Sequence, residues 1–126
     1  MSKQAIHTNL APQAIGPYSQ AIRIGNLLFT SGQLGMDPAT NEFPQTAAEQ
    51  AKQALSNVAA ILEEAGASMS QVIKTTVFLK DMNDFAAVNE VYATFFEQPY
   101  PARSAVEVAR LPKDGLVEIE VIAQLL

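Results

Sequence analysis

The strongest structural signal in this sequence is a stripe of apolar residues between Thr46 and Gly66. These residues recur at steps of three and four, which is the spacing of one face of an α-helix. Thr46 and Glu49 have the pattern of a capping box, and Gly66 stands where a left-handed residue ends a helix. The pattern predicts a helix with one apolar face. Its positions are Ala48, Ala51, Leu55, Val58, Leu62 and Ala65.

A second helix is predicted from about Asp84 to Glu97, because apolar residues from Phe85 to Phe95 share one helical face. Pro99 prevents its continuation. Segments rich in β-branched or alternating residues predict strands. Their ranges are 3–8, 21–24, 27–31, 72–79, 104–109 and 117–123.

The resulting order is β-β-β-α-β-α-β-β, an α+β pattern over one domain, residues 1–126. Right-handed crossovers place both helices on one face of a mixed sheet. Segment 72–79 is nevertheless partly apolar on both of its faces. A sheet face that is too apolar for water usually marks an interface. We therefore expect an obligate homo-oligomer in which the open sheet faces pack together.

The side-chain inventory excludes several kinds of chemistry. The chain has no cysteine and one histidine, His7, which removes thiolate nucleophiles, His-based metal clusters and Ser-His-Asp catalysis. A net charge of −5 disfavours nucleic-acid binding. No apolar stretch approaches the roughly 20 residues that span a bilayer. We therefore predict no metal, cofactor, nucleic-acid or membrane partner. The start of the sequence lacks a secretory pattern, so we expect a cytoplasmic protein.

Glycine-rich phosphate motifs are absent from the sequence, and the segment from Gly32 to Gly35 is predicted to be a turn. Lys74 lies in an apolar strand, and a lysine amine can form a Schiff base with a carbonyl substrate. A lysine on a partly solvated strand face is the commoner interpretation. His7 is interpreted as an ordinary surface residue.

Five short motifs carry more specific information. They are Gly16-Pro17-Tyr18-Ser19-Gln20-Ala21, Thr30-Ser31-Gly32-Gln33, Asn89-Glu90-Val91-Tyr92, Pro101-Ala102-Arg103-Ser104-Ala105-Val106-Glu107-Val108 and Glu118-Ile119-Glu120. In this order and spacing, the chain closely resembles the RidA family, also called YjgF, of reactive-intermediate imine deaminases. The resemblance covers essentially the whole chain.

The resemblance implies a chorismate-mutase-like fold, a homotrimer and ligand clefts between subunits. The implied reaction hydrolyses 2-iminopropanoate and 2-iminobutanoate, or their enamine tautomers, to 2-oxo acids and ammonia. Pyridoxal-phosphate dehydratases release these intermediates, which connects the family with isoleucine biosynthesis and metabolite damage control.

The family's functional residues map onto this chain by motif position. Arg103 matches the arginine that binds the substrate carboxylate, and Glu118 matches the acid associated with water. Ala105 departs from the cysteine of several relatives, and the segment before Pro101 is shorter than in some of them. The matched pocket residues are Tyr18, Ser31, Gly32, Asn89, Arg103 and Ala105.

These residue types suit imine hydrolysis. An arginine holds a carboxylate through two parallel N–H bonds, which fixes the plane of the substrate as well as its charge. A glutamate such as Glu118 can take a proton from the attacking water and return it to the departing nitrogen.

Other interpretations stay open from the sequence alone. The same cleft could serve a regulatory trimer that binds 2-oxo acids without turnover. A ribonuclease is disfavoured by the acidic composition and the single histidine. Arg103 could pair with Glu107 on the surface, Glu118 and Glu120 could face solvent, and Tyr18 could simply pack its turn.

If the strands that carry Arg103 and Glu118 form a hairpin through Asp114-Gly115, the two residues lie far apart along the ladder. The separation is then on the order of 25 Å. On that assumption, Arg103 and Glu118 meet only across a subunit boundary.

Overall fold

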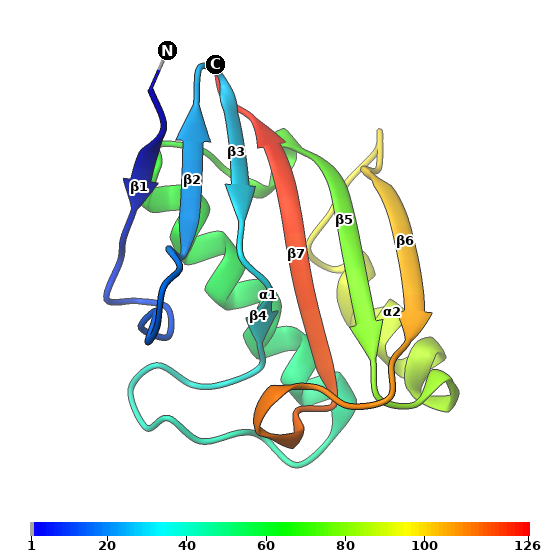
Figure 1. Cartoon of the computed structure of the whole chain (residues 1–126). Helices are drawn as coiled ribbons and strands as arrows, with labels where there is room; N and C mark the ends of the chain where they lie inside the picture. The colour runs from blue at the N-terminus through cyan, green and yellow to red at the C-terminus, as the bar shows by residue number, and fades with distance from the viewer. Residues whose placement is uncertain (1) are drawn as a thin grey trace.

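The computed structural model describes residues 2–126. In this part of the chain, the strands form one mixed sheet in the order β1-β2-β3-β7-β5-β6, and β4 pairs with β7. The strands are β1 (Gln4–Ile6), β2 (Ala21–Ile24), β3 (Leu27–Thr30), β4 (Gln33–Leu34), β5 (Val72–Leu79), β6 (Ala102–Glu107) and β7 (Val117–Gln124). The helices are α1 (Ala47–Glu64) and α2 (Phe85–Ala93), with short 3₁₀ turns at Met69–Gln71, Met82–Asp84 and Pro112–Asp114. Both helices lie behind the sheet in Figure 1, which confirms the predicted α+β arrangement.

The ends of α1 are fixed by the residues that predicted them. The Thr46 hydroxyl accepts the backbone N–H of Glu49 at 3.1 Å, which satisfies one of the free donors of the first turn. Gly66 adopts φ 78°, and the following N–H of Ala67 donates to the Leu62 carbonyl at 2.8 Å. This left-handed ending requires glycine, because a side chain there would be strained.

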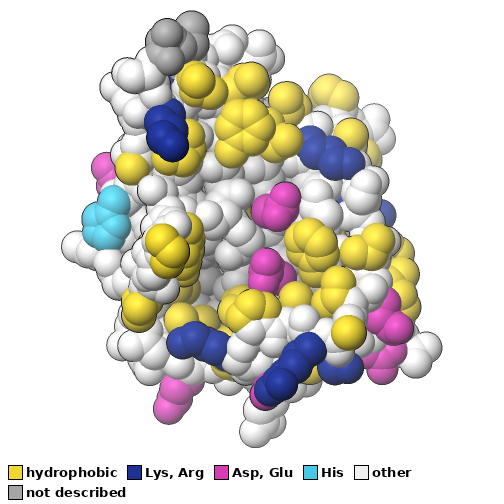
Figure 2. All heavy atoms as spheres, in the orientation of Figure 1, with side chains coloured by type: hydrophobic (Ala, Val, Ile, Leu, Met, Phe, Trp, Pro, Cys, Tyr) yellow, Lys and Arg dark blue, Asp and Glu magenta, His cyan; other side chains and the backbone are white. Residues whose placement is uncertain are grey.

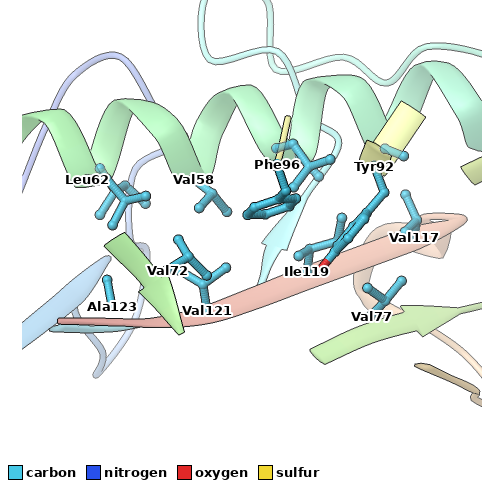
Figure 3. Packing of buried hydrophobic residues seen from close by; sticks show 14 of the residues in the cluster. Val58, Leu62, Val72, Val77, Tyr92, Phe96, Val117, Ile119, Val121 and Ala123 are labelled. Atoms are coloured by element: carbon cyan, nitrogen blue, oxygen red, sulfur yellow. The ribbon is translucent and has the colours of Figure 1, made fainter. Parts of the chain in front are cut away.

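The core lies between α1 and the central strands of the sheet. Val58 and Leu62 point from α1 toward the part of β7 that carries Val121 and Ala123 (Figure 3), and Val58, Leu62 and Val121 are at most 2% exposed. Burying each such side chain stabilises the fold by about 1.5–3 kcal/mol. The apolar face of α1 is therefore the main attachment of the helix layer to the sheet.

Among the predicted boundaries that differ from the structure, two lie close to the site. Helix α2 ends at Ala93 instead of Glu97, because the Thr94 hydroxyl donates to the Val91 carbonyl at 2.6 Å and closes the last turn. Strand β6 starts at Ala102, two residues before the predicted start, so that Arg103 lies within the strand.

The predicted turn from Gly32 to Gly35 is wrong, because its middle forms β4. Leu34 pairs with Glu118 of β7, and the buried Asn57 amide of α1 donates to the Leu34 carbonyl at 3.1 Å. A side chain distant in sequence thus holds this segment extended, which local turn chemistry could not reveal.

The supposed hairpin between the strands of Arg103 and Glu118 is also wrong. Strand β5 lies between them, parallel to β6 and antiparallel to β7. The segment 108–116 crosses the end of the sheet instead, with Asp114 at φ 57°. The estimate of 25 Å along a shared ladder therefore does not apply.

The face of the sheet opposite the helices carries exposed apolar side chains, as the sequence predicted. Phe29 is 41% exposed and Val106 45% exposed, and they lie on opposite sides of this face. Figure 2 shows hydrophobic side chains around two acidic side chains on this open face. Across residues 2–126, no helix is long and apolar enough to cross a membrane.

Candidate active site

Two hollows of similar size contain most of the predicted site residues. The first, which we call the glutamate hollow, has a volume of about 430 Å³. It lies where the N-terminal loop, β4 and β7 meet. Its lining includes Ile15, Tyr18, Ser31, Gly32, Leu34 and Glu118.

A buried glutamine holds the wall of the glutamate hollow in place. The Gln20 side chain is 2% exposed, accepts the Thr8 N–H at 2.7 Å and donates to the Pro12 carbonyl at 2.8 Å. The Ser31 hydroxyl donates to the Ser19 carbonyl at 2.6 Å. These bonds join the loop that carries Tyr18 to the end of β3. Tyr18 itself is 54% exposed at the rim.

Glu118 lies half-buried on the open face of β7, where it pairs with Leu34 on one side and Phe78 on the other. Burial, followed by the negative charge of Glu120, raises the pKa of the Glu118 carboxyl. A Cβ on Gly32 would come within 2.7 Å of Glu118 Cδ, so only glycine leaves room for this carboxyl. The predicted turn residue Gly32 thus sets the space for the predicted acid.

The second hollow, which we call the arginine hollow, also has a volume of about 430 Å³. It opens beside the edge strand β6, on the face of the sheet that carries α2. Aromatic and aliphatic groups make most of its wall, so a charged ligand group here has one cationic partner and little else. The lining residues are Asn89, Tyr92, Ala93, Tyr100, Pro101 and Arg103.

Three side chains of α2 surround the Arg103 guanidinium. Its Nη1 donates to Asn89 Oδ1 at 2.6 Å. Its Cζ lies 5.2 Å from the ring centre of Phe85 and 4.8 Å from that of Tyr92, both within the range of cation–π attraction. Phe85, Asn89 and Tyr92 are spaced by four and three residues, so one face of α2 presents all of them. The remaining guanidinium N–H groups are available to an anion.

The two hollows of one chain are not parts of one pocket. Arg103 points to the helix side of the sheet, whereas Glu118 alternates with buried Val117 and Ile119 and so points to the open side. Thr75 is the register partner of both Arg103 and Val121, which places the two site residues two strands apart. That separation is about 10 Å across the sheet and about 10 Å along it.

The remaining candidates are placed as follows. Ala105 lies half-buried on β6 beside Val77 and lines neither hollow. Lys74 donates to Ser104 Oγ at 3.0 Å on the open face. His7 is exposed next to Asn9.

The alternative in which Arg103 pairs with Glu107 is wrong, because Glu107 accepts the Met82 N–H and Arg103 pairs with Asn89. Sequence reasoning missed the contacts of Phe85 and Tyr92 with Arg103. Their spacing around Asn89 on a predicted helix was the signal that could have found them.

Metal-ligating side chains do not gather at either hollow. Over the described residues 2–126, no three His, Asp or Glu side chains lie close enough together to hold an ion. The two hollows together offer an anion-binding guanidinium and a carboxyl with a raised pKa. Such a pair can hold a carboxylate and move a proton.

Comparison with known proteins agrees with this chemistry. The chain is 55% identical to the 2-iminobutanoate/2-iminopropanoate deaminase of Escherichia coli K12, over 98% of each protein. The crystal structure of Escherichia coli TdcF with bound serine matches with a TM-score of 0.92 and 51% identity, over 96% of this chain and 98% of that one.

A third relative is RidA from an Antarctic Psychrobacter, whose crystal structure matches with a TM-score of 0.94 and 50% identity. The match covers 97% of this chain and 99% of that one. The family model described as endoribonuclease L-PSP matches residues 8–125, almost the whole sequence. The chain therefore belongs to this family, the RidA/YjgF family that its five motifs resemble.

Proposed function

We propose that this protein hydrolyses 2-imino acids, such as 2-iminobutanoate and 2-iminopropanoate, to 2-oxo acids and ammonia. The observation that carries the proposal is the oriented guanidinium of Arg103, the one cationic group that lines a mostly apolar hollow. It is a site for one small carboxylate. The 55% identity to the Escherichia coli deaminase supports the same assignment.

The proposal includes a homotrimer in which Arg103 of one subunit faces Glu118 of the next. Within one chain these residues point to opposite sides of the sheet, so one small ligand cannot touch both. Packing the open faces together would cover exposed Phe29, Ile73 and Val106. It would also bring the glutamate hollow of one copy against the edge strand β6 of another.

In this arrangement, Arg103 binds the substrate carboxylate through two N–H groups, while Asn89 occupies another. The imine carbon is then held at a fixed distance and angle from the glutamate hollow. Holding the reacting groups in this way removes much of the entropic barrier to attack by water.

Glu118 then moves the protons. Its carboxylate accepts a proton from the water as the oxygen bonds to the imine carbon, which gives a carbinolamine. For an imine whose nitrogen is protonated, this proton then passes from Glu118 to the carbinolamine nitrogen. Glu118 takes the hydroxyl proton as the C–N bond breaks, and ammonia leaves with the electron pair of that bond as the 2-oxo acid forms. A pKa raised by burial and by Glu120 brings the carboxyl closer to the working pH of such a proton carrier.

The reaction consumes only water, so the proposal assigns no cofactor. The imines would come from pyridoxal-phosphate enzymes. A cytoplasmic location of this protein is also part of the proposal. The role of Glu118 requires that it contact water and not only the ligand.

A stopped-flow assay tests the proposal. An amino-acid oxidase generates the imine from 2-aminobutyrate or alanine, and the disappearance of the imine is followed with and without the protein. We expect a faster loss of imine and stoichiometric ammonia. Binding of a 2-oxo acid without any rate increase would favour a regulatory trimer and contradict the deaminase proposal.

The family description as an endoribonuclease gives a second readout. We expect no cleavage of single-stranded RNA, because the chain is acidic and has one histidine. That residue, His7, is exposed and hydrogen-bonds to Asn9. Cleavage by purified protein that disappears in Arg103→Ala would overturn this assignment.

A further inference from the structure

The surroundings of Arg103 contain a hydrogen bond that the proposed reaction does not use. The Tyr92 hydroxyl lies 2.8 Å from Thr75 Oγ1. Thr75 is fully buried and Tyr92 is 6% exposed. Two polar groups have thus been placed in the apolar layer between α2 and β5, where each satisfies the other.

This pair is located directly behind Arg103. Thr75 of β5 is the register partner of Arg103 in the parallel ladder, and the Tyr92 ring centre lies 4.8 Å from Arg103 Cζ. Figure 3 shows the Tyr92 side chain extending from α2 toward the sheet, with Phe96 beside it. The two ring centres are 4.5 Å apart, so Phe96 restricts the movement of the Tyr92 ring.

We propose that Tyr92, anchored by Thr75, is a positioning residue that fixes the plane of the Arg103 guanidinium for the substrate carboxylate. This inference rests on the proposed function, in which Arg103 binds that carboxylate. An exposed arginine has many rotamers, and a bidentate bond needs one of them. Rigid contacts formed before the ligand arrives reduce the entropy that binding must remove.

Asn89 cannot fix the plane alone. Its single hydrogen bond to Nη1 leaves the guanidinium free to rotate about that contact. The Phe85 ring adds a second contact at 5.2 Å, but Phe85 is half-buried, whereas Tyr92 is buried and anchored at its far end. The Thr75–Tyr92 bond therefore ties the far end of the Tyr92 ring to β5, the strand next to the one that carries Arg103.

Binding of pyruvate, used as a carboxylate probe and measured by calorimetry, tests the role of Tyr92. Tyr92→Leu removes the ring, and we expect binding to weaken about two- to fivefold, the usual range for a cation–π contact at an exposed site. Tyr92→Phe and Thr75→Val each keep the packing but remove the anchor. We expect each to weaken binding about twofold, at the lower end of the range for loss of the whole ring, because the aromatic contact with Arg103 stays and only its anchor is removed. The double variant Tyr92→Phe/Thr75→Val should bind pyruvate no more weakly than either single variant, because both substitutions remove the same hydrogen bond.

Val91→Ala is the matched control, since Val91 packs against the core from the same helix, does not line the arginine hollow, and is not three or four residues away from Phe85, Asn89 or Tyr92. It should lower the melting temperature and leave pyruvate binding unchanged. Unchanged binding in all folded Tyr92 and Thr75 variants would overturn the positioning role. If Arg103→Lys also bound pyruvate normally, the proposed carboxylate site itself would fail, so the two failures are distinguishable.

A spectroscopic readout is independent of any ligand. Nitrogen-15 relaxation of the Arg103 side chain should report an ordered Nε–H in the parent protein. We expect a clear loss of order in Tyr92→Leu and a smaller loss in Tyr92→Phe, with Val91→Ala like the parent. An equally mobile Arg103 in parent and Tyr92→Leu would contradict the inference.

Discussion

Replacing Arg103 by lysine separates the geometry of the carboxylate site from its charge. Lysine keeps the positive charge but offers a point donor instead of two parallel N–H groups. It also loses the planar contacts with Phe85 and Tyr92. If one charge-assisted hydrogen bond is lost, the cost is about 1.5–3 kcal/mol, or about a 10- to 150-fold fall in kcat/KM.

The fold should tolerate this change, because Arg103 is exposed and its hydrogen-bond partner Asn89 is neutral. We expect the free energy of unfolding to fall by no more than about 1 kcal/mol, the value of an exposed cation–π contact. The stopped-flow imine assay and a denaturant titration measure the two quantities. Arg23→Lys is the control, since Arg23 lies on β2, donates to the Gly25 carbonyl and lines neither hollow. A folded Arg103→Lys protein with near-normal kcat/KM would refute the role of Arg103.

Three further changes probe the glutamate hollow and the need for metal. Burial and the charge of Glu120 raise the pKa of Glu118, so the ionised carboxylate destabilises the fold. Because Glu118→Gln removes this charge, it should raise the melting temperature at pH 7. That gain should vanish below the ordinary carboxyl pKa of about 4.3, where both side chains are neutral; a gain independent of pH would contradict the account. Gly32→Ala should displace the Glu118 carboxyl and lower kcat by up to about 100-fold. The control Gly66→Ala should lower the stability of the fold and leave kcat unchanged. Equal kcat values in the two variants would contradict this role of Gly32. Activity should survive EDTA, since the sequence has no cysteine and one histidine; a loss restored by a divalent ion would show the opposite.

The spacing of apolar residues, together with the residues that cap helices and form turns, predicted most of the fold. The stripe from Ala48 to Ala65, with Thr46 and Gly66 at its ends, predicted α1 correctly because helix caps are local interactions. Alternation along 117–123 correctly predicted a strand, and Glu118 lies on the face of that strand opposite the core. The apolar second face of 72–79 correctly indicated that the open side of the sheet carries exposed hydrophobic groups.

Long-range contacts account for what the sequence could not predict. Strand β4 is held by Asn57, and Gln20 pins the N-terminal loop through bonds to Thr8 and Pro12. The strand order was missed because a neighbour in sequence, β6, is not the neighbour of β7 in the sheet. The motif matches named Arg103 and Glu118 but gave no sign that each belongs to a different hollow.

The claim that each active site is shared between subunits has one direct test. Arg103→Ala and Glu118→Ala proteins, each inactive alone, are unfolded together and reassembled, and mixed trimers are verified by native mass spectrometry. In a cyclic trimer, every mixed ring has one boundary where an intact Arg103 faces an intact Glu118. Equal mixing makes about three-quarters of the rings mixed, so about a quarter of the sites should regain activity. Verified mixed trimers without any recovered imine hydrolysis would contradict the shared site.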